Sequence, residues 1–531
     1  MSTGQSLESS TRSEVFRRHL TGAGEAAPAP AADVVLLLEG TYPYVTGGVS
    51  SWVHGIISGM PDLSFGLIFL SANYEERELK YTLPSNVSFL SEVGIYDYIP
   101  YRFLPEEGND STGREEALAA AKRFCLDLQE GHAASFDKVY EYLSRRVLSI
   151  GDLAYSPMGW KLLRDVYEAS AGEAPFANFF WNWRFTYLSL WNLLYAHIPP
   201  ARLYHAVSTG WAGYLGAVAK KRYGIPLILT EHGIYLNERR IELSQSGVMG
   251  VKEEGLSVNP EMSYLTKMWV NFFNATTKLC YERCDAIYTL HAGNRRMQID
   301  MGAPEDMVEV IPNGVDVEAL CQKASIERVS ASTWDEKSPL HIGFVGRVVS
   351  IKDVKTLIRA CRLVIDKLPN VEVLLMGPTD EEKEYFSECR NLVELLGLGD
   401  KVKFLGRVDV REYFPNIDVQ VLTSISEGQP LVILEGYCSG VPVVATKVGA
   451  CLEMVEGLEP EDRALGPSGI VTRVGNPEET AVAILKILRN PALRKEMAEA
   501  ARERVCRFYD DRKMISRYRD IYETYIHEPC Q

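Results

Sequence analysis

The sequence has no excess of basic residues. Its 531 residues carry 56 Lys and Arg against 71 Asp and Glu, a formal charge of −15. A nucleic-acid-binding protein needs a basic face that neutralises phosphates, so nucleic acid is not an expected partner. A small anionic ligand is still compatible, because a site can be locally positive within an acidic protein.

Long apolar runs are also missing. No stretch of 18 uncharged apolar residues occurs, and the N-terminus lacks the charged-then-apolar pattern of a signal peptide. Neither a membrane span nor a secretory leader is therefore predicted. The expected location is the cytoplasm.

The sequence also lacks a repeated pattern of paired cysteines and any Asp-x-Asp element. Ten cysteines are scattered along the chain, and the closest pair, Cys280 and Cys284, has the spacing of one helix face. We expect reduced, mostly buried thiols. Without an Asp-x-Asp element no metal-chelating carboxylate pair is apparent, and we do not expect the protein to use a metal ion.

What the chain does have is length for two or more domains, since one hydrophobic core does not grow to 531 residues. Residues 1–32 end in an Ala-, Pro- and Gly-rich segment that favours a disordered leader. The apolar run Val34–Leu38 then predicts a buried parallel strand, which leads through Gly47 and Gly48 into a helix carrying Trp52. A strand, a glycine loop and a helix are the opening unit of a doubly wound α/β domain.

Residues from about 100 to 198 interrupt this alternation with helical patterning. They contain an aromatic block, NFFWNWRFTYLSLWNLLY, from Asn178 to Tyr195. Its polar interruptions argue against a membrane span. We interpret it as a buried helix within a helical insertion, with a docking surface for a partner or a membrane face as the alternative.

Strands and helices then alternate again in two blocks. LYHAVS, PLILTEHG and DAIYTL read as strands, followed by the turn signature IPNGVD and a polar stretch near 322–338. A second α/β domain begins with LHIGFVGRV and continues with the strands VEVLLMGP, KVKFLGRV, VQVLTS and PVVATK. We expect an N-terminal domain over 33–325, a C-terminal domain over 338–506 and a final helix over 507–531.

The pattern SISEGQPLVILE carries the strongest chemical signal. Glu427 and Glu435 lie eight positions apart, and Pro430 suits the first turn of a helix that follows the strand VQVLTS. The start of that helix offers free backbone N–H groups and a positive dipole to a phosphate. Glu427 could then accept sugar hydroxyls, and Glu435, inside the helix, could hold a ribose.

A second signal is the pair formed by Arg347, directly after Gly346, and Lys352. The glycine lets a backbone approach closely, and the two cations could converge on one diphosphate. Such charges are usually solvated when they occur alone. Together with the two glutamates they favour a nucleotide-sugar site.

These motifs, with the Gly47-Gly48-Val49 loop and IPNGVD, resemble the family-4 retaining glycosyltransferases of the GT-B fold, over residues 33 to about 528. More narrowly, EGTYPYVTGGVSSWVHGII, TEHGIYLNERRIEL and LTSISEGQPLVILEG resemble the cytoplasmic glycosyltransferases of bacterial Pel exopolysaccharide systems. The resemblance implies two Rossmann-like domains that face each other across a cleft, the N-terminal one binding the acceptor. The final helix is expected to cross back to the N-terminal domain.

The resemblance also implies roles for particular residues. The donor diphosphate would be bound by Arg347 and Lys352, the ribose by Glu435, and the donor-sugar hydroxyls by Glu427. Backbone amides of the segment Gly428, Gln429, Pro430 and Leu431 would cap sugar and phosphate oxygens, and Gly47 and Gly48 would close over the diphosphate. Relatives place an active-site histidine after an N-terminal strand, and here His205 and His232 are both candidates, each with a structural alternative.

The expected function is transfer of a hexose or N-acetylhexosamine from a UDP-sugar to a growing exopolysaccharide, without a cofactor. Retention in this family needs no covalent protein nucleophile, so catalysis is mainly positioning and charge stabilisation. Inner-membrane polysaccharide synthesis and export proteins are the implied partners. Two alternatives stay open: a GT-B nucleotide-sugar epimerase, and a non-catalytic scaffold that binds nucleotide sugars.

Overall fold

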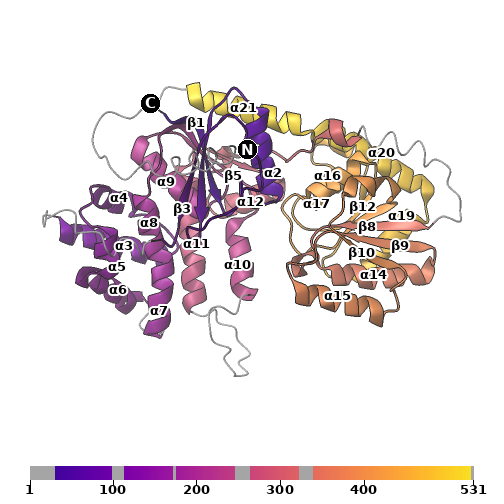
Figure 1. Ribbon diagram of the computed structural model, residues 1–531, viewed down its shortest axis with the longest axis horizontal. Coiled ribbons are helices and arrows are strands. Elements are labelled where there is room, and N and C mark those ends of the chain that lie inside the picture. Colours follow the sequence, from indigo (N-terminus) through magenta and orange to yellow (C-terminus); the bar gives the residue numbers. More distant parts are fainter. Residues whose placement is uncertain (1–29, 98–112, 171–174, 246–263, 322–338, 528–531) are drawn as a thin grey trace, which may run out of the picture. The chain divides into compact units, whose positions relative to one another are not determined.

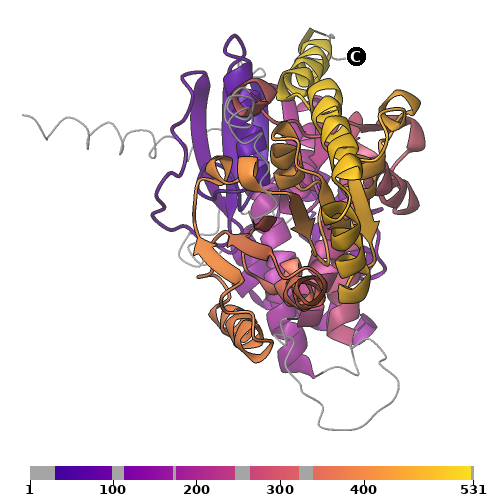
Figure 2. The ribbon, with the colours of Figure 1, turned by 90° about the vertical axis from the view of Figure 1, so that its right-hand side faces the viewer.

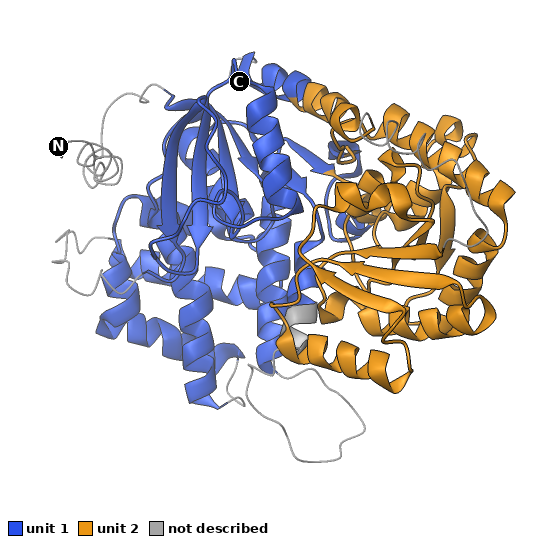
Figure 3. Ribbon diagram, turned by 45° about the vertical axis from the view of Figure 1, so that its right-hand side comes forward, with its two compact units in different colours: residues 1–288, 297–309, 519–531 blue, residues 289–296, 310–518 orange. Residues whose placement is uncertain are grey.

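The computed structural model describes residues 30–97, 113–170, 175–245, 264–321 and 339–527. Most of the expected leader and the expected domain boundary at 322–338 lie outside these ranges. Within them, contacts divide the chain into two units, one of residues 1–288, 297–309 and 519–531 and the other of residues 289–296 and 310–518 (Figure 3).

The first unit is built on a seven-stranded sheet with the order β3-β2-β1-β4-β5-β6-β7. The strands are β1 (Ala32–Glu39), β2 (Phe65–Ser71), β3 (Val87–Gly94), β4 (Ala201–Ala206), β5 (Leu227–Glu231), β6 (Ala286–Thr289) and β7 (Val308–Val310). The pairings of β1 with β2 and β4, of β2 with β3 and of β4 with β5 are parallel. The strand order reverses between β1 and β4, which makes this the topological switch point of the sheet.

Helices cover both faces of this sheet (Figure 1). In the register of the sheet Leu36 lies opposite His205, so these two side chains share a face with α2 (Gly48–Gly59) and α21 (Asp511–His527). Val35 and Leu37 point the other way, into the core formed with α9 (Trp211–Tyr223) and α11 (Tyr264–Arg283). Strands buried on both faces explain the continuous apolar runs of the sequence.

The expected helical insertion lies between β3 and β4 and joins the same core (Figure 1). It contains α3 (Arg114–Gln129), α4 (Phe136–Ser144), α5 (Ile150–Tyr155), α6 (Pro157–Ser170), α7 (Phe176–Trp183), the π-helical turn η2 (Arg184–Leu188) and α8 (Ser189–Tyr195). The aromatic block spans the last three elements. Trp183 and Trp191 are buried, as expected for a core helix, but Trp181 is 58% exposed.

The second unit contains a six-stranded parallel sheet with the order β10-β9-β8-β11-β12-β13. Its strands are β8 (Leu340–Val345), β9 (Val371–Met376), β10 (Val402–Gly406), β11 (Val419–Leu422), β12 (Val443–Thr446) and β13 (Gly469–Thr472). Here the order reverses between β8 and β11. Each unit therefore has the strand order of a Rossmann fold.

Two helical layers enclose the second sheet. The helices α14 (Val354–Lys367) and α19 (Pro477–Leu488) pack in one core, and α16 (Leu431–Cys438), α17 (Cys451–Glu456) and α20 (Pro491–Phe508) pack in another. In Figure 2, α20 and the start of α21 follow one another in yellow. The remaining elements are α10 (Tyr235–Gln245), α12 (Ala292–Asp300), α15 (Lys383–Leu395), α18 (Pro460–Arg463), η3 (Glu305–Met307), η4 (Ser350–Lys352), η5 (Val410–Glu412) and η6 (Phe414–Asn416).

The boundary of the first unit differs from the expected one at residue 325. The segment from Val310 to Cys321 belongs to the second unit. Two contacts within that unit explain this: the backbone of Asn313 bonds to the side chain of Gln429, and Val315 bridges to Asp510. At the other end of the chain, α21 from Arg519 onward packs in the first unit, where Tyr522 bonds to His205.

The strands expected from apolar runs are confirmed as β1, β4–β6 and β8–β12, whereas β2, β3, β7 and β13 were not among the expected elements. All seven residues of β2 are buried, so its run FGLIFLS was a signal that could have been used. The strand β3 is half exposed and β13 has four residues, which makes both patterns weak. In the described ranges no helix combines the length and apolarity needed to cross a bilayer.

Candidate active site

Two loops of the second unit leave the sheet at its switch point. Residues 346–353 follow β8, and residues 423–430 follow its parallel neighbour β11. Because parallel strands end at the same edge, both loops emerge side by side, in the place where open α/β sheets bind ligands. Backbone contact joins them directly, since the amide of Ile425 donates to the carbonyl of Ile351 over 2.8 Å.

Lys352 and Glu427, predicted from separate motifs, meet at this edge. Lys352 Nζ donates to Glu427 Oε1 over 2.5 Å, and Ser424 Oγ donates to the same oxygen over 2.6 Å. The two charged side chains are only 17% and 11% exposed. A charge-assisted hydrogen bond in partial shelter from water is stronger than a surface pair. Lys352 and Ser424 thus hold the Glu427 carboxylate in one orientation, although Lys352 lies 75 positions earlier in the chain.

A buried threonine fixes the position of Lys352. Thr423 Oγ1 donates to the carbonyls of Lys352 and Asp353 over 3.1 and 3.0 Å. Asp353 itself has a φ of 43° and accepts from the amide of Thr356 as the N-cap of α14. An aspartate tolerates this left-handed conformation better than most residues do, and its side chain satisfies a helix-start amide.

The helix α16 begins directly after the loop of residues 423–430. Pro430 is its N-cap residue, in agreement with the predicted helix start. Pro430 has no N–H group, so only its neighbours can supply the predicted anion-binding amides. Gly449, with a φ of 49°, packs so closely that a Cβ atom would lie 2.2 Å from the carbonyl oxygens of Glu427 and Gly428. A glycine is required at that position, both for the conformation and for the space.

The side chain of Gln429 has a structural partner. Its Oε1 accepts from the amide of Asn313 over 2.7 Å and its Nε2 donates to the carbonyl of Asn313 over 3.1 Å. This side chain therefore anchors the IPNGVD turn. Any contact of Gln429 with a donor would come from its backbone.

Arg347 pairs with a carboxylate, and Glu435 lies near a cation. Arg347 is 54% exposed, and its Nη1 donates to Glu381 over 2.6 Å. Glu435 lies on α16, where burial raises its pKa and the nearby guanidinium of Arg411 opposes that rise. The structure thus brings Lys352 and Glu427 together, whereas convergence of Arg347 with Lys352 on one anion stays a prediction.

In the first unit, the predicted glycine loop forms the start of α2. Gly47 is the N-cap residue and Gly48 the first helical residue, and both are exposed. A helix start with exposed glycines presents its first N–H groups without side-chain obstruction. Closure of this loop over a diphosphate stays a prediction.

The environment of His205 favours the structural alternative over a catalytic role. It is fully buried, with Nδ1 2.8 Å from Tyr522 Oη and Nε2 2.8 Å from Thr230 Oγ1. Burial, assisted by the neighbouring His232, lowers its pKa to about 3. On the α2 and α21 face of β4, its two hydrogen bonds link α21 to β5 of the sheet.

His232 is the better candidate of the two. It follows β5 and contacts Trp52 edge-to-face, with ring centroids 4.7 Å apart. Burial lowers its pKa to about 4, so the ring is neutral near pH 7. Its Nε2 is buried, and no described residue bonds to it.

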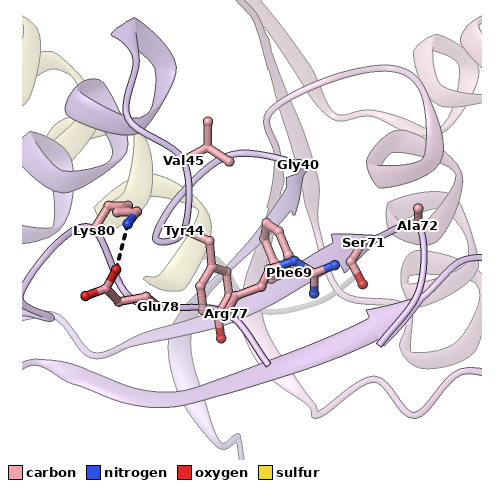
Figure 4. Close-up of a pocket in the computed structure, with 9 residues that line it drawn as sticks. All are labelled: Gly40, Tyr44, Val45, Phe69, Ser71, Ala72, Arg77, Glu78 and Lys80. Atoms are coloured by element: carbon pink, nitrogen blue, oxygen red, sulfur yellow. Dashed lines mark hydrogen bonds and ion pairs between the residues drawn. The ribbon is translucent and has the colours of Figure 1, made fainter. Parts of the chain in front are cut away.

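A depression of about 350 Å³ opens at the carboxyl ends of β1 and β2 (Figure 4). Tyr44 and Phe69 form part of its wall, with ring centroids 4.7 Å apart. Gly40, Arg77 and Lys80 also line it. Aromatic faces next to charged hydrogen-bonding groups suit a hydroxylated ligand.

One group of metal-ligand type occurs among the described residues: Asp127, Glu130 and His132, in and after α3. Asp127 already accepts from the amide and hydroxyl of Ser135 over 2.9 and 2.6 Å. We interpret Asp127 as an anchor for the turn between α3 and α4.

Sequence reasoning assigned no role to Thr423, Ser424 or Arg411, although Ser424 begins the pattern SISEGQPLVILE. The first two end the strand VQVLTS, and polar residues at the carboxyl end of a buried strand are a usable signal. Arg411 had no such signal. It lies in the 3₁₀ turn η5, and only the fold brings it near Glu435.

The two Rossmann-type units define the class of the protein as a GT-B fold. A solved structure with this fold, Anabaena Alr3699/HepE in complex with UDP, aligns with a TM-score of 0.56 and 18% identity over 93% of this chain and all of that one. Sucrose-phosphate synthase from Thermosynechococcus elongatus aligns with a TM-score of 0.55 and 16% identity over 93% and 98%. At such identities the likeness establishes the fold.

Residues 32–306 match the family described as domain of unknown function DUF3492, and the chain belongs to that family. Residues 327–504 match the family described as glycosyl transferases group 1. The N-acetyl-alpha-D-glucosaminyl L-malate synthase of Bacillus anthracis is 27% identical over 41% of this chain and 54% of its own length. A D-inositol 3-phosphate glycosyltransferase of Nocardiopsis dassonvillei is 25% identical over 55% and 63%. The chain thus spans less than two thirds of these curated relatives.

Proposed function

We propose that this protein is a retaining glycosyltransferase that moves a hexose or an N-acetylhexosamine from a UDP-sugar to a growing exopolysaccharide of the Pel type. The observation that carries the proposal is the Lys352–Glu427 pair at the switch point of the second sheet, beside the start of α16. The GT-B fold and the match of residues 327–504 to group 1 glycosyl transferases support it.

In this proposal the leaving diphosphate is stabilised by Lys352, Arg347 and the first amides of α16. Lys352 has three N–H donors, of which Glu427 takes one. Arg347 pairs with Glu381, which is itself 42% exposed, and a surface pair of this kind contributes little to stability. A diphosphate, with two or more negative charges, would therefore displace Glu381 at small cost.

Glu427 would position the donor sugar. Lys352 and Ser424 both bond to its Oε1, so the carboxylate is oriented before a ligand binds. Preorganised groups of this kind accelerate a reaction because they do not reorganise at the moment of bond breaking. The sugar hydroxyls would donate to this carboxylate, and the ribose hydroxyls to Glu435.

We propose uridine as the base of the donor because HepE, a protein of the same fold, was solved in complex with UDP and glucose. The exopolysaccharide acceptor follows the sequence motifs of residues 39–57 and 230–243. Cytoplasmic synthesis at the inner-membrane face, next to export proteins, is part of the same proposal.

The test is a thermal-shift screen of the purified chain against UDP, GDP and ADP sugars, followed by product analysis by NMR. Selective stabilisation by UDP-sugars and an acceptor glycoside of retained anomeric configuration are expected. An epimerised or free sugar would instead identify an epimerase, and binding without turnover would identify a scaffold. Lys352→Met should lower transfer by about 10²–10³. Lys403→Met, which breaks an exposed pair with Glu372, is the matched control.

A further inference from the structure

The N-terminal sheet has its own polar group at its switch point. Glu39 is the last residue of β1, whose neighbour in the sheet is β4, and the strand order reverses between these two strands. Ligands of open α/β sheets bind outside the carboxyl ends of strands at such a point. The side chain of Glu39 is 14% exposed there.

The contacts of Glu39 hold its carboxylate at the edge. Oε2 accepts from the amide of Trp211, at the start of α9, over 2.9 Å and from Ser208 Oγ over 3.4 Å. Oε1 accepts from Tyr235 Oη over 2.8 Å and lies 4.0 Å from the guanidinium of Arg239. The same Tyr235 ring supports Arg239, whose guanidinium carbon lies 4.8 Å from the ring centroid. One buried tyrosine thus orients both members of an ion pair.

This arrangement is unusual for a helix cap alone. Burial raises the pKa of Glu39 even though Arg239, Tyr235 and two backbone amides at the start of α9 oppose that rise. A short Ser or Asp would cap a helix start without burying so long a carboxylate. Arg239 is 35% exposed, so a ligand can reach the guanidinium from solvent. A sheltered carboxylate with a specific cation at the carboxyl edge of a parallel sheet is a typical functional arrangement.

Two independent observations point to a ligand at the same edge. His232 follows β5, the strand beside β4, and its buried Nε2 has no partner among the described residues. The depression of about 350 Å³ includes Gly40, the residue directly after Glu39. A ligand at this edge would find an acceptor or donor nitrogen, a carboxylate, a guanidinium and a partly aromatic hollow.

We propose that Glu39 and Arg239 are acceptor-positioning residues that bind neighbouring hydroxyl groups of a saccharide. A carboxylate accepts from two hydroxyl groups, and a planar guanidinium donates to the oxygens of a vicinal diol, so the pair matches a sugar ring. This inference rests on the proposed function, because it names the acceptor as a carbohydrate. The adjoining depression then holds a further part of the saccharide chain.

The experiment measures saccharide binding to the full chain by saturation-transfer NMR. The probes are di- to tetrasaccharides of glucose, galactose, N-acetylglucosamine and N-acetylgalactosamine. Glu39→Gln and Arg239→Lys are the test variants, because they keep the size and lose one charge or the planar fork. Glu168→Gln and Arg164→Lys, an exposed pair 3.6 Å apart on α6, are the matched controls.

We expect a saccharide of the panel to bind the wild-type protein and both controls equally, and to bind the two test variants at least about fivefold more weakly. Circular dichroism verifies folding, and Arg239→Lys decides the outcome if Glu39→Gln does not fold. Equal binding by the test variants, or no saccharide binding by the wild type, would overturn the inference. Saccharide binding that depends on Glu39 in a protein that binds no nucleotide sugar would refute the proposed function and leave this inference standing.

Discussion

Replacement of His205 by Gln tests whether this histidine is structural. The imidazole is fully buried between Tyr522 and Thr230, and burial lowers its pKa to about 3. In an unfolded chain a histidine titrates near pH 6.5, at roughly its reference value. Between these values the unfolded chain binds a proton that the folded protein does not, so stability must fall as the pH falls.

The magnitude follows from the two pKa values. The contribution of the neutral ring is complete above about pH 6.5 and is lost progressively toward pH 3. At pH 5 the free energy of unfolding of the wild-type protein is lower by about 2 kcal/mol, since each pH unit below 6.5 corresponds to about 1.4 kcal/mol. At pH 7.5 the His205→Gln variant should be about 1–3 kcal/mol less stable than the wild type, because it disturbs two buried hydrogen bonds. Gln does not titrate, so only the wild type loses this stability. The gap in free energy of unfolding between the wild type and His205→Gln should therefore narrow by about 2 kcal/mol at pH 5.

Urea unfolding at pH 7.5 and pH 5.0, followed by tryptophan fluorescence, measures this gap. Seven of the eight tryptophans lie between residues 52 and 269, so the signal follows the first unit. A gap that stays constant between the two pH values would mean that His205 is protonated in the folded protein, and would refute the structural role. In the same variant, turnover at pH 7.5 should stay within about tenfold of the wild type, whereas loss of a general acid or base reduces rates by about 10²–10⁴.

Three further predictions concern the second unit. Glu427→Gln and Lys352→Met should each lower turnover by about 10²–10³ while the far-UV circular dichroism stays unchanged, because each removes a preorganised charge; near-native rates would exclude the residue from the mechanism. Gly449→Ala should destabilise the protein by at least about 2 kcal/mol and reduce donor affinity, whereas Gly475→Ala, with a φ of 66° but open space, should cost only about 1 kcal/mol in thermal unfolding. Glu435→Gln should raise KM for the donor with little change in kcat, and an unchanged KM would argue against ribose binding.

Residue chemistry and spacing predicted much of the candidate site. Lys352 and Glu427 were both selected from their motifs, and Pro430 marked the start of α16. These signals are local, since a glycine or proline limits the backbone at its own position. The partners of Arg347 and Gln429 were not predictable in this way. Glu381 and Asn313 lie 34 and 116 residues away, and only the chain path brings them into contact.

The two histidines illustrate the same limit. Both follow or end a buried strand in similar sequence surroundings, yet His205 bonds to Tyr522 across 317 residues and His232 keeps an unbonded nitrogen among the described residues. Which face of the strand a side chain occupies depends on register, and a shift of one residue would exchange the faces. No local pattern distinguishes these two histidine environments.

The amino-acid sequence by itself determined the class of fold, the helical insertion and the separate motifs, because apolar periodicity and turn residues act over a few positions. The tertiary structure decided which of those motifs meet. It placed β8 beside β11, and so Lys352 beside Glu427, and it placed β1 beside β4, where Glu39 lies at a second switch point. Such pairings depend on strand order and register over tens to hundreds of residues, and those are properties of the packed core as a whole.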